Sequence, residues 1–258
     1  MGCIMKQGSG LYARMRVGAV LLAAGQGSRM GNQPKSLLRL QGVPLINRHL
    51  ITLSGAGVDE VVVVTGYYHE QVEPLVEQFP VQVARNLNPG AGQPSSVRLG
   101  IETLGDKFDA VIMMLCDQPL ISTTDITTLI AAFKKRAWGD VLIPRVNGQR
   151  GNPIIMSGAA VGRILADGQN MYCRKYIDEH PEAVTYLDSD NEHFVTDIDT
   201  LADITAFEEK TGWSLRLPSV LDPAPAVPGA ADAVKAGNAG NNATEPAYLA
   251  LRRRLAVS

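Results

Sequence analysis

Three strongly apolar runs constrain the fold of this 258-residue chain more than any other feature. They span Val17–Leu22, Glu60–Thr65 and Ala110–Leu115, and the second contains four consecutive valines. A run without polar alternation is typical of a strand that is buried on both faces, as in parallel sheets. Ligands of such sheets bind beyond the carboxyl ends of the strands.

The segments between these runs have helical spacing of apolar residues or read as short strands. Helices are expected at 45–56, 69–79, 95–104, 123–136, 158–165, 171–179 and 200–210, and short strands at 81–84, 140–143, 154–156, 183–187 and 194–196. The helix that starts at Ser95 is expected to have a serine cap. This alternation predicts a three-layer α/β fold, in which helices cover both faces of a mostly parallel, twisted, Rossmann-like sheet.

Composition sets the domain limits. Residues 17–217 are expected to form one domain, because the 1–16 extension is polar and glycine-rich and the 218–258 tail is dominated by Ala, Pro, Gly and Asn. Both ends would bury too little apolar surface to offset their ordering entropy, so we expect them to be disordered.

Charge and cysteine content narrow the partners. The net charge of −2 creates no field that would draw the protein onto nucleic acid, and no apolar run approaches the roughly 20 residues of a membrane helix. The three cysteines include no pair with Cys-x-x-Cys spacing, which favours a reducing compartment. We therefore expect a cytoplasmic protein with neither a nucleic-acid nor a membrane partner.

A glycine-rich loop follows the first strand, from Ala23 to Lys35. Its small residues let backbone N–H groups approach an anion closely, and Arg29 and Lys35 add two cations. The P-loop motif is absent, since Lys35-Ser36 follows a proline, and the glycines are spaced one residue too long for the dinucleotide fingerprint. An ordinary tight turn is the alternative, but the two cations favour a polyphosphate ligand.

Acidic residues follow two later elements. Asp117 comes directly after the strand Ala110–Leu115, and Asp197 and Asp199 precede the last helix. Carboxylates at the ligand edge of a sheet suit Mg²⁺. Asp117 alone is equally compatible with a turn, and Asp199 or Thr200 with a helix cap. Alternate residues point to opposite sides of a strand, so only one of the pair Asp197 and Asp199 is expected to face the ligand.

The loop carries a resemblance. Leu22-Ala23-Ala24-Gly25-x-Gly27-x-Arg29-Met30-Gly31, followed by Lys35, resembles the signature of nucleotidyltransferases related to the molybdenum cofactor enzymes, the MobA-like NTP transferase domains. The likeness extends from Val17 to about Phe207. It implies an Mg²⁺ ion held by Asp117 and Asp199, catalytic roles for Lys35, Arg29 and Asp117, and a triphosphate bound by Leu22, Ala23, Ala24, Gly25, Gly27, Ser28, Arg29 and Lys35.

The resemblance also indicates the nucleotide. Gly90 and Ser96 match a glycine and a serine that recognise cytosine in related cytidylyltransferases. The guanylyl version of the loop usually has a glycine where Ala24 stands, so CTP is the expected substrate.

The acceptor side departs from the family pattern. Arg150-Gly151-Asn152-Pro153 resembles a segment that lines the acceptor side, and with Arg174 it supplies the expected acceptor-binding residues Arg150, Asn152 and Arg174. Of the family segment Gly-Asp-x-Gly-Ala-Arg, however, only Arg174 is retained, which leaves the acceptor open.

These features predict transfer of CMP from CTP to a phosphorylated acceptor, a molybdopterin-type cofactor, with release of pyrophosphate. A molybdenum hydroxylase apoenzyme is the implied protein partner. Two alternatives stay open: cytidylyl or guanylyl transfer to another phosphate acceptor, and a non-catalytic chaperone that binds the cofactor. A dinucleotide-dependent oxidoreductase is disfavoured by the glycine spacing and by the second strand, which ends in Thr65-Gly66 rather than an acidic residue.

Overall fold

A computed structural model of the protein describes residues 14–167 and 171–218. Most of the expected N-terminal extension and all of the tail after Pro218 lie outside these residues. None of the helices within the described ranges is long and apolar enough to cross a membrane.

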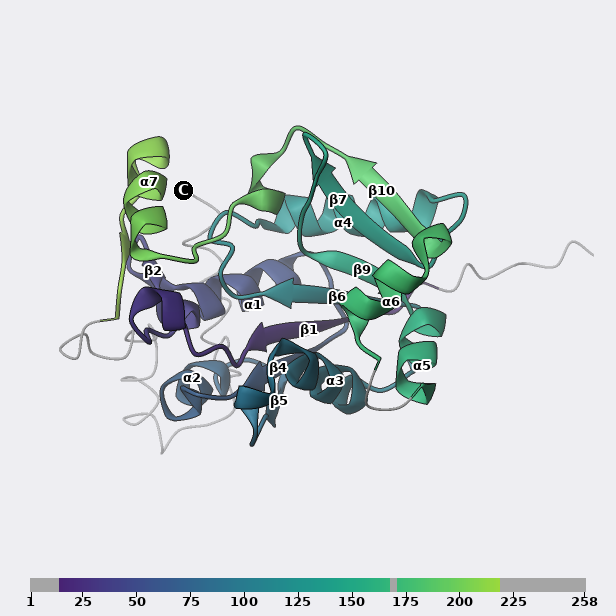
Figure 1. Cartoon of the computed structure of the whole chain (residues 1–258), viewed down its shortest axis with the longest axis horizontal. Coiled ribbons are helices and arrows are strands. Elements are labelled where there is room, and N and C mark those ends of the chain that lie inside the picture. Colours follow the sequence, from purple (N-terminus) through teal and green to yellow (C-terminus); the bar gives the residue numbers. More distant parts are fainter. Residues whose placement is uncertain (1–13, 168–170, 219–258) are drawn as a thin grey trace, which may run out of the picture.

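The described chain is organised around one central sheet (Figure 1). Its strands run in the order β10-β7-β9-β6-β1-β4-β5, and β8 (Gln149–Arg150) pairs with the end of β7. Only β9 is antiparallel to its neighbours in this order. The mostly parallel sheet is therefore confirmed, and its strands are β1 (Val17–Ala23), β4 (Glu60–Thr65), β5 (Gln82–Arg85), β6 (Ala110–Leu115), β7 (Val141–Val146), β9 (Ile154–Ser157) and β10 (Val184–Asp188).

Helices cover both faces of the sheet, as expected. Residues from α1 (Leu45–Gly55), α2 (His69–Val76) and α4 (Thr123–Lys135) pack into the core on one face. Residues from α3 (Gln93–Leu104), α5 (Gly158–Ala166) and α6 (Cys173–Glu179) form the core on the other. Strand β1 contributes to both cores, because its apolar residues are buried on either side of the sheet.

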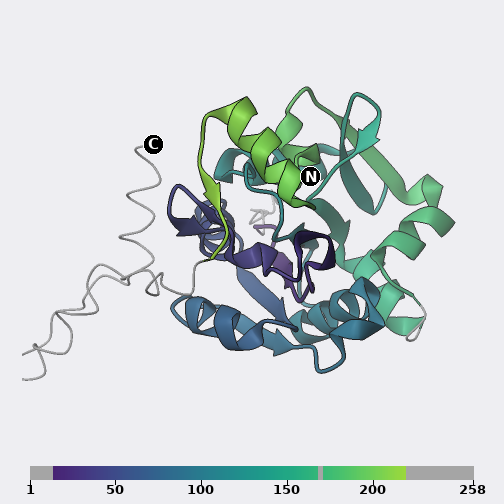
Figure 2. The ribbon, with the colours of Figure 1, turned by 60° about the vertical axis from the view of Figure 1, so that its left-hand side comes forward.

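A third, smaller core was not predicted. Strands β2 (Arg39–Leu40), β3 (Val43–Pro44) and β11 (Leu215–Arg216) form an antiparallel sheet that packs with α7 (Leu201–Thr211) around Leu38, Leu40, Phe207 and other apolar residues. Figure 2 shows α7 and β11 beside the purple segment that follows β1. This small core joins the segment after β1 to the C-terminal end of the described chain.

The prediction of a strand at 194–196 is wrong. Residues Glu192–Val195 form a 3₁₀ turn instead. The carbonyl of Phe194 accepts hydrogen bonds from the Gln118 side chain and from the Asn152 N–H, both at about 3 Å, so it is satisfied without a strand partner.

The parallel strands bring the predicted site together at one edge. Ala23 of β1 is in register with Thr65 of β4, and Leu22 is in register with Leu115 of β6. The segments that follow these three strands therefore leave the sheet side by side. The loop with Arg29 and Lys35, the segment after Thr65 and the Asp117 turn lie at the same carboxyl edge.

Candidate active site

The loop after β1 folds around glycine. Gly27 has φ +65°, and a Cβ atom there would lie 2.0 Å from the carbonyl oxygen of Gln33, so both backbone angle and space require glycine. The Gly27 carbonyl accepts hydrogen bonds from the N–H groups of Met30 and Asn32. Met30 is buried in the small third core, which anchors the turn and leaves Arg29 exposed beside the cavity described next.

A cavity of about 410 Å³ opens above this edge of the sheet. Every residue predicted to bind the nucleotide lines it: Leu22, Ala23, Ala24, Gly25, Gly27, Ser28, Arg29, Lys35, Gly90 and Ser96. Asp117 lines the same cavity, with the loop after β1 on one side and the start of α3 on the other. The residues expected to contact phosphates and base are thus gathered around one space, while their roles stay predictions.

Lys35 lies between two carboxylates. Its Nζ is 3.3 Å from Asp117 Oδ2 and forms a second, shorter contact with Asp199 Oδ1. Arg29 Nη1 lies 2.8 Å from the other oxygen of Asp199. The structure therefore joins two carboxylates from distant parts of the sequence through one ammonium group.

Burial disfavours the ionised form of Asp117. Its pKa is raised, mainly because the carboxyl is desolvated, and Lys35 opposes the shift only in part. The N–H of Ile198 donates to the Asp117 carbonyl at 2.9 Å, which fixes the segment carrying Asp199 beside it.

Of the two neighbouring acids, Asp199 contacts the cations. Ile198 between them is buried in the small core, and Asp197 is exposed with no ion pair among the residues described. The pKa of Asp197 is also raised, first by desolvation and then by the charge of Asp199. Asp199 is therefore the acid of the two that pairs with Lys35 and Arg29, while its place in a metal site stays a prediction.

The two carboxylates fit a magnesium ion. Asp117 Oδ1 is buried and has no hydrogen-bond partner in the described part of the chain, so it is free to coordinate a cation. No cluster of three or more His, Cys, Asp or Glu side chains suited to a metal occurs among the described residues. Mg²⁺ is usually held by one or two carboxylates together with substrate phosphates and water, which matches this donor set.

A second cavity, of about 590 Å³, adjoins the first. Leu22, Gln93 and Leu115 line both, so the two cavities are neighbours. All three residues expected to bind the acceptor line the second cavity: Arg150, Asn152 and Arg174.

Its arginines already have a partner. Arg150 Nη1 lies 3.3 Å from Asp178 and Arg174 Nε lies 3.9 Å from the same carboxylate. Two guanidinium groups thus share one acid, and the cluster keeps one positive charge. Met113, Ile143 and Ile154 make the other walls apolar.

Sequence reasoning missed several residues of the first cavity. Helix α3 begins at Gln93 rather than Ser95, with Gly92 at φ +90° before it and no serine cap, so Gln93 comes to line both cavities. Tyr67 also lines the first cavity and is 42% exposed. Its position two residues after a buried strand at the ligand edge was the signal that could have found it.

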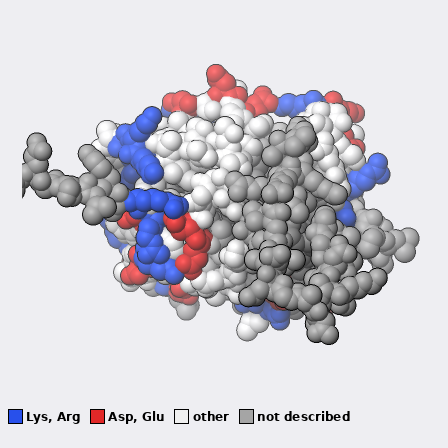
Figure 3. All heavy atoms as spheres, turned by 180° about the vertical axis from the view of Figure 1, so that it is seen from behind, with Lys and Arg blue, Asp and Glu red and all other residues white. Residues whose placement is uncertain are grey.

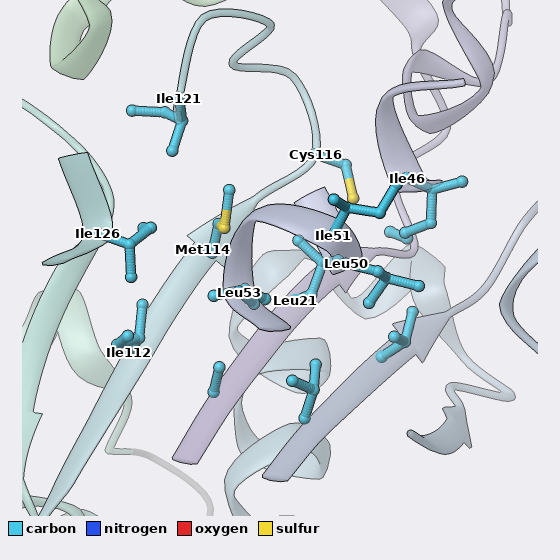
Figure 4. Packing of buried hydrophobic residues seen from close by; sticks show 14 of the residues in the cluster. Leu21, Ile46, Leu50, Ile51, Leu53, Ile112, Met114, Cys116, Ile121 and Ile126 are labelled. Carbon is cyan, nitrogen blue, oxygen red and sulfur yellow. The ribbon is translucent and has the colours of Figure 1, made fainter. Parts of the chain in front are cut away.

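Cys116 borders the first cavity, but its buried thiol is unsuited to act as a nucleophile. Its side chain lies among Ile46, Leu50 and Ile51 in the core (Figure 4), and burial raises the pKa of its thiol well above the usual range. Cys116 and Cys173 are both unpaired and buried. Cys116 is best described as a small residue of the hydrophobic core.

Charges on the face seen from behind are mixed. Lys and Arg lie beside Asp and Glu near the margins of that face, and its visible centre carries neither (Figure 3). The visible part of this face therefore offers no extended basic surface of the kind that binds nucleic acid.

The fold, the glycine-rich loop and the cavity that it borders define a nucleotidyltransferase. The chain belongs to the family of MobA-like NTP transferase domains, whose model matches residues 19–184.

Individual relatives carry different names. Nicotine blue oxidoreductase of Paenarthrobacter nicotinovorans is 28% identical over 72% of this chain and 93% of its own length. A 2-C-methyl-D-erythritol 4-phosphate cytidylyltransferase of Thermobifida fusca is 35% identical over 52% of this chain and 56% of its own. Among solved structures, a nucleotidyl transferase from Methanothermobacter is 24% identical with a TM-score of 0.62, covering 76% of this chain and 97% of that one.

Proposed function

We propose that this protein transfers CMP from CTP to a phosphorylated acceptor and releases pyrophosphate. The observation that carries the proposal is Lys35, held between Asp117 and Asp199 at the edge of a cavity that adjoins a second, arginine-lined one. The first cavity would hold the triphosphate and the second the acceptor.

The reaction is a direct in-line displacement. A phosphate oxygen of the acceptor attacks the α-phosphorus of CTP, the α–β bridging P–O bond breaks, and the electron pair leaves with pyrophosphate. Lys35 and Arg29 move from Asp199 to the triphosphate and neutralise charge on the leaving group, while the loop amides orient it. No covalent intermediate with the protein is needed.

Asp117 and Asp199 would hold Mg²⁺. When bound, this ion supplies charge neutralisation along the polyphosphate and orients it. The residues of this chain would contribute the carboxylate oxygens, among them Asp117 Oδ1, which has no hydrogen-bond partner among the described residues.

We infer that the acceptor is a molybdopterin-type cofactor and that a molybdenum hydroxylase apoenzyme receives the product in the cytoplasm. Support comes from the family and from the second cavity, where the apolar walls suit the flat face of a heteroaromatic ring and the Arg150–Arg174 pair suits a phosphate group. Another phosphate acceptor, or binding of the cofactor without turnover, is the competing interpretation.

The test is pyrophosphate release with each nucleoside triphosphate, with and without molybdopterin cofactor, and with methylerythritol phosphate or a sugar phosphate as alternative acceptors. Release with CTP that requires the molybdopterin acceptor supports the proposal. Pyrophosphate release only with another acceptor shows that the proposed acceptor is wrong. Binding of the molybdopterin cofactor without any pyrophosphate release supports the interpretation as a non-catalytic chaperone. Because one relative is named an oxidoreductase, reduction of a dye with a nicotinamide cofactor is the control reaction.

A further inference from the structure

Asn86, just after β5, orders a small polar network beside the first cavity. The Asn86 side chain is buried, and its Oδ1 accepts from the N–H of Asn88 at 2.9 Å. A backbone N–H can only donate, so this contact fixes which end of the amide is the oxygen. The Nδ2 group therefore faces the hydroxyls of Ser95 and Ser96, to which it donates at 2.8 and 2.9 Å.

The hydroxyls of Ser95 and Ser96 differ in whether their protons are already used in a hydrogen bond. Ser95 uses its proton in a hydrogen bond to the carbonyl of Gly92 at 2.8 Å. Ser96 is 4% exposed and lines the cavity, and within the described chain its side chain makes no hydrogen bond besides the one from Asn86. Because the Asn86 amide donates to the Ser96 hydroxyl, the hydroxyl proton must point away from that amide. Accepting one hydrogen bond also makes the Ser96 hydroxyl a stronger donor.

A donor at this position distinguishes two pyrimidines. Cytosine carries a lone pair at N3, whereas uracil carries an N–H there. A hydroxyl that acts as a donor can form a hydrogen bond with N3 of cytosine. With uracil, the same hydroxyl faces the N3–H group, which is also a donor. An unpaired buried donor is costly, so one hydroxyl of fixed polarity gives useful discrimination.

We propose that Asn86 is a positioning residue that turns the Ser96 hydroxyl into a donor for N3 of cytosine, and thereby selects CTP over UTP. The inference rests on the proposed function, in which Gly90 and Ser96 contact the cytosine ring of CTP. It adds a residue that does not itself line the cavity and that acts through Ser96.

The test is the affinity of the full-length protein for CTP and for UTP, measured by titration calorimetry with Mg²⁺ and without acceptor. We expect the wild type to favour CTP by at least about tenfold, the size of one buried hydrogen bond. In Asn86→Asp the carboxylate only accepts, so Ser96 must donate to it and offers lone pairs to the base. The CTP/UTP ratio should then fall by about tenfold or more, in favour of UTP.

Two serine variants complete the design. Ser96→Ala removes the donor and should weaken CTP but not UTP, which brings the ratio close to one. Ser95→Ala is the matched control, because it removes the neighbouring hydroxyl but leaves the bond between Asn86 and Ser96, so the ratio should stay at the wild-type value.

The outcomes separate this inference from the function on which it rests. An unchanged ratio in folded Asn86→Asp or in Ser96→Ala, with CTP still bound, overturns the role of Asn86 and leaves the proposed function standing. If Asn86→Asp does not fold, Ser96→Ala against Ser95→Ala decides. A wild type that binds no CTP, or binds GTP more tightly, overturns the proposed choice of nucleotide itself.

Discussion

His49 should make the stability of this protein depend on pH. It lies in α1 and is 1% exposed, and neither ring nitrogen has a hydrogen-bond partner among the described residues. Burial, with the charge of Arg48 as a smaller cause, lowers the pKa of His49 from 6.5 to about 3, and the backbone of Cys116 opposes the shift only in part. The folded protein therefore keeps this imidazole neutral where the unfolded chain protonates it.

The sign and size follow from linkage. A lowered pKa in the folded state gives stability that is fully present above pH 6.5 and is lost as pH falls toward 3. Each pH unit costs about 1.4 kcal/mol, so at pH 4.5 the free energy of unfolding should have lost about 3 kcal/mol through this residue.

Urea unfolding of the wild type and of His49→Leu from pH 4.5 to 8 measures the effect. Leucine removes the titrating ring and two unsatisfied nitrogens, so the variant should be at least as stable as the wild type at pH 8, and its advantage should grow as the pH falls to 4.5. His180→Leu, at a histidine whose side chain is 43% exposed, is the matched control and should keep most of the loss in stability between pH 8 and 4.5. Parallel curves for the wild type and His49→Leu would refute the reasoning.

The candidate site gives three more expectations. Lys35→Ala should lower turnover by about 10²–10³, because one preorganised cation at developing charge is worth about 3–4 kcal/mol. Its melting temperature should also fall, since the change leaves Asp117 and Asp199 facing each other without the ammonium group between them. Wild-type pyrophosphate release by the folded variant would remove Lys35 from the site. Asp117→Asn and Asp199→Asn should each abolish turnover, while Asp197→Asn should have a mild effect. The melting temperature of Asp117→Asn should hold or rise, because burial raises the pKa of that carboxyl. A magnesium titration of pyrophosphate release compares the three variants, and full activity in Asp117→Asn contradicts the mechanism. Ala24→Gly should relax the preference for CTP over GTP in kcat/KM without reversing it, and an unchanged ratio would exclude Ala24 from nucleotide choice.

The elements that sequence predicted well are those with long apolar runs. β4 and β6 have the expected boundaries, and β1 extends one residue further, because a buried strand requires continuous apolar residues. The small third sheet escaped prediction, since strands of two residues are too short to show any periodicity.

Prediction of the site was limited by what a linear pattern can carry. The loop with Lys35 and the turn with Asp117 follow strands, so topology alone placed them at one edge. The contact between Lys35 and Asp199 depends on the third core, and the network around Asn86 depends on the earlier start of α3. The partnership of Arg150 with Asp178 likewise required the folded chain, because the two residues lie on separate elements.

The third core has a consequence for motion. It is small, and it carries Asp199 toward Asp117, which lies in the turn after β6 of the central sheet. Small apolar clusters open locally at lower free energy than large ones, and opening of α7 would withdraw Asp199 from Lys35. A ligand that joins the two carboxylates therefore holds this segment shut. Backbone amides along α7 as far as Thr211 should exchange hydrogen with the solvent more slowly when the site is filled, although no residue of that helix lines the cavity.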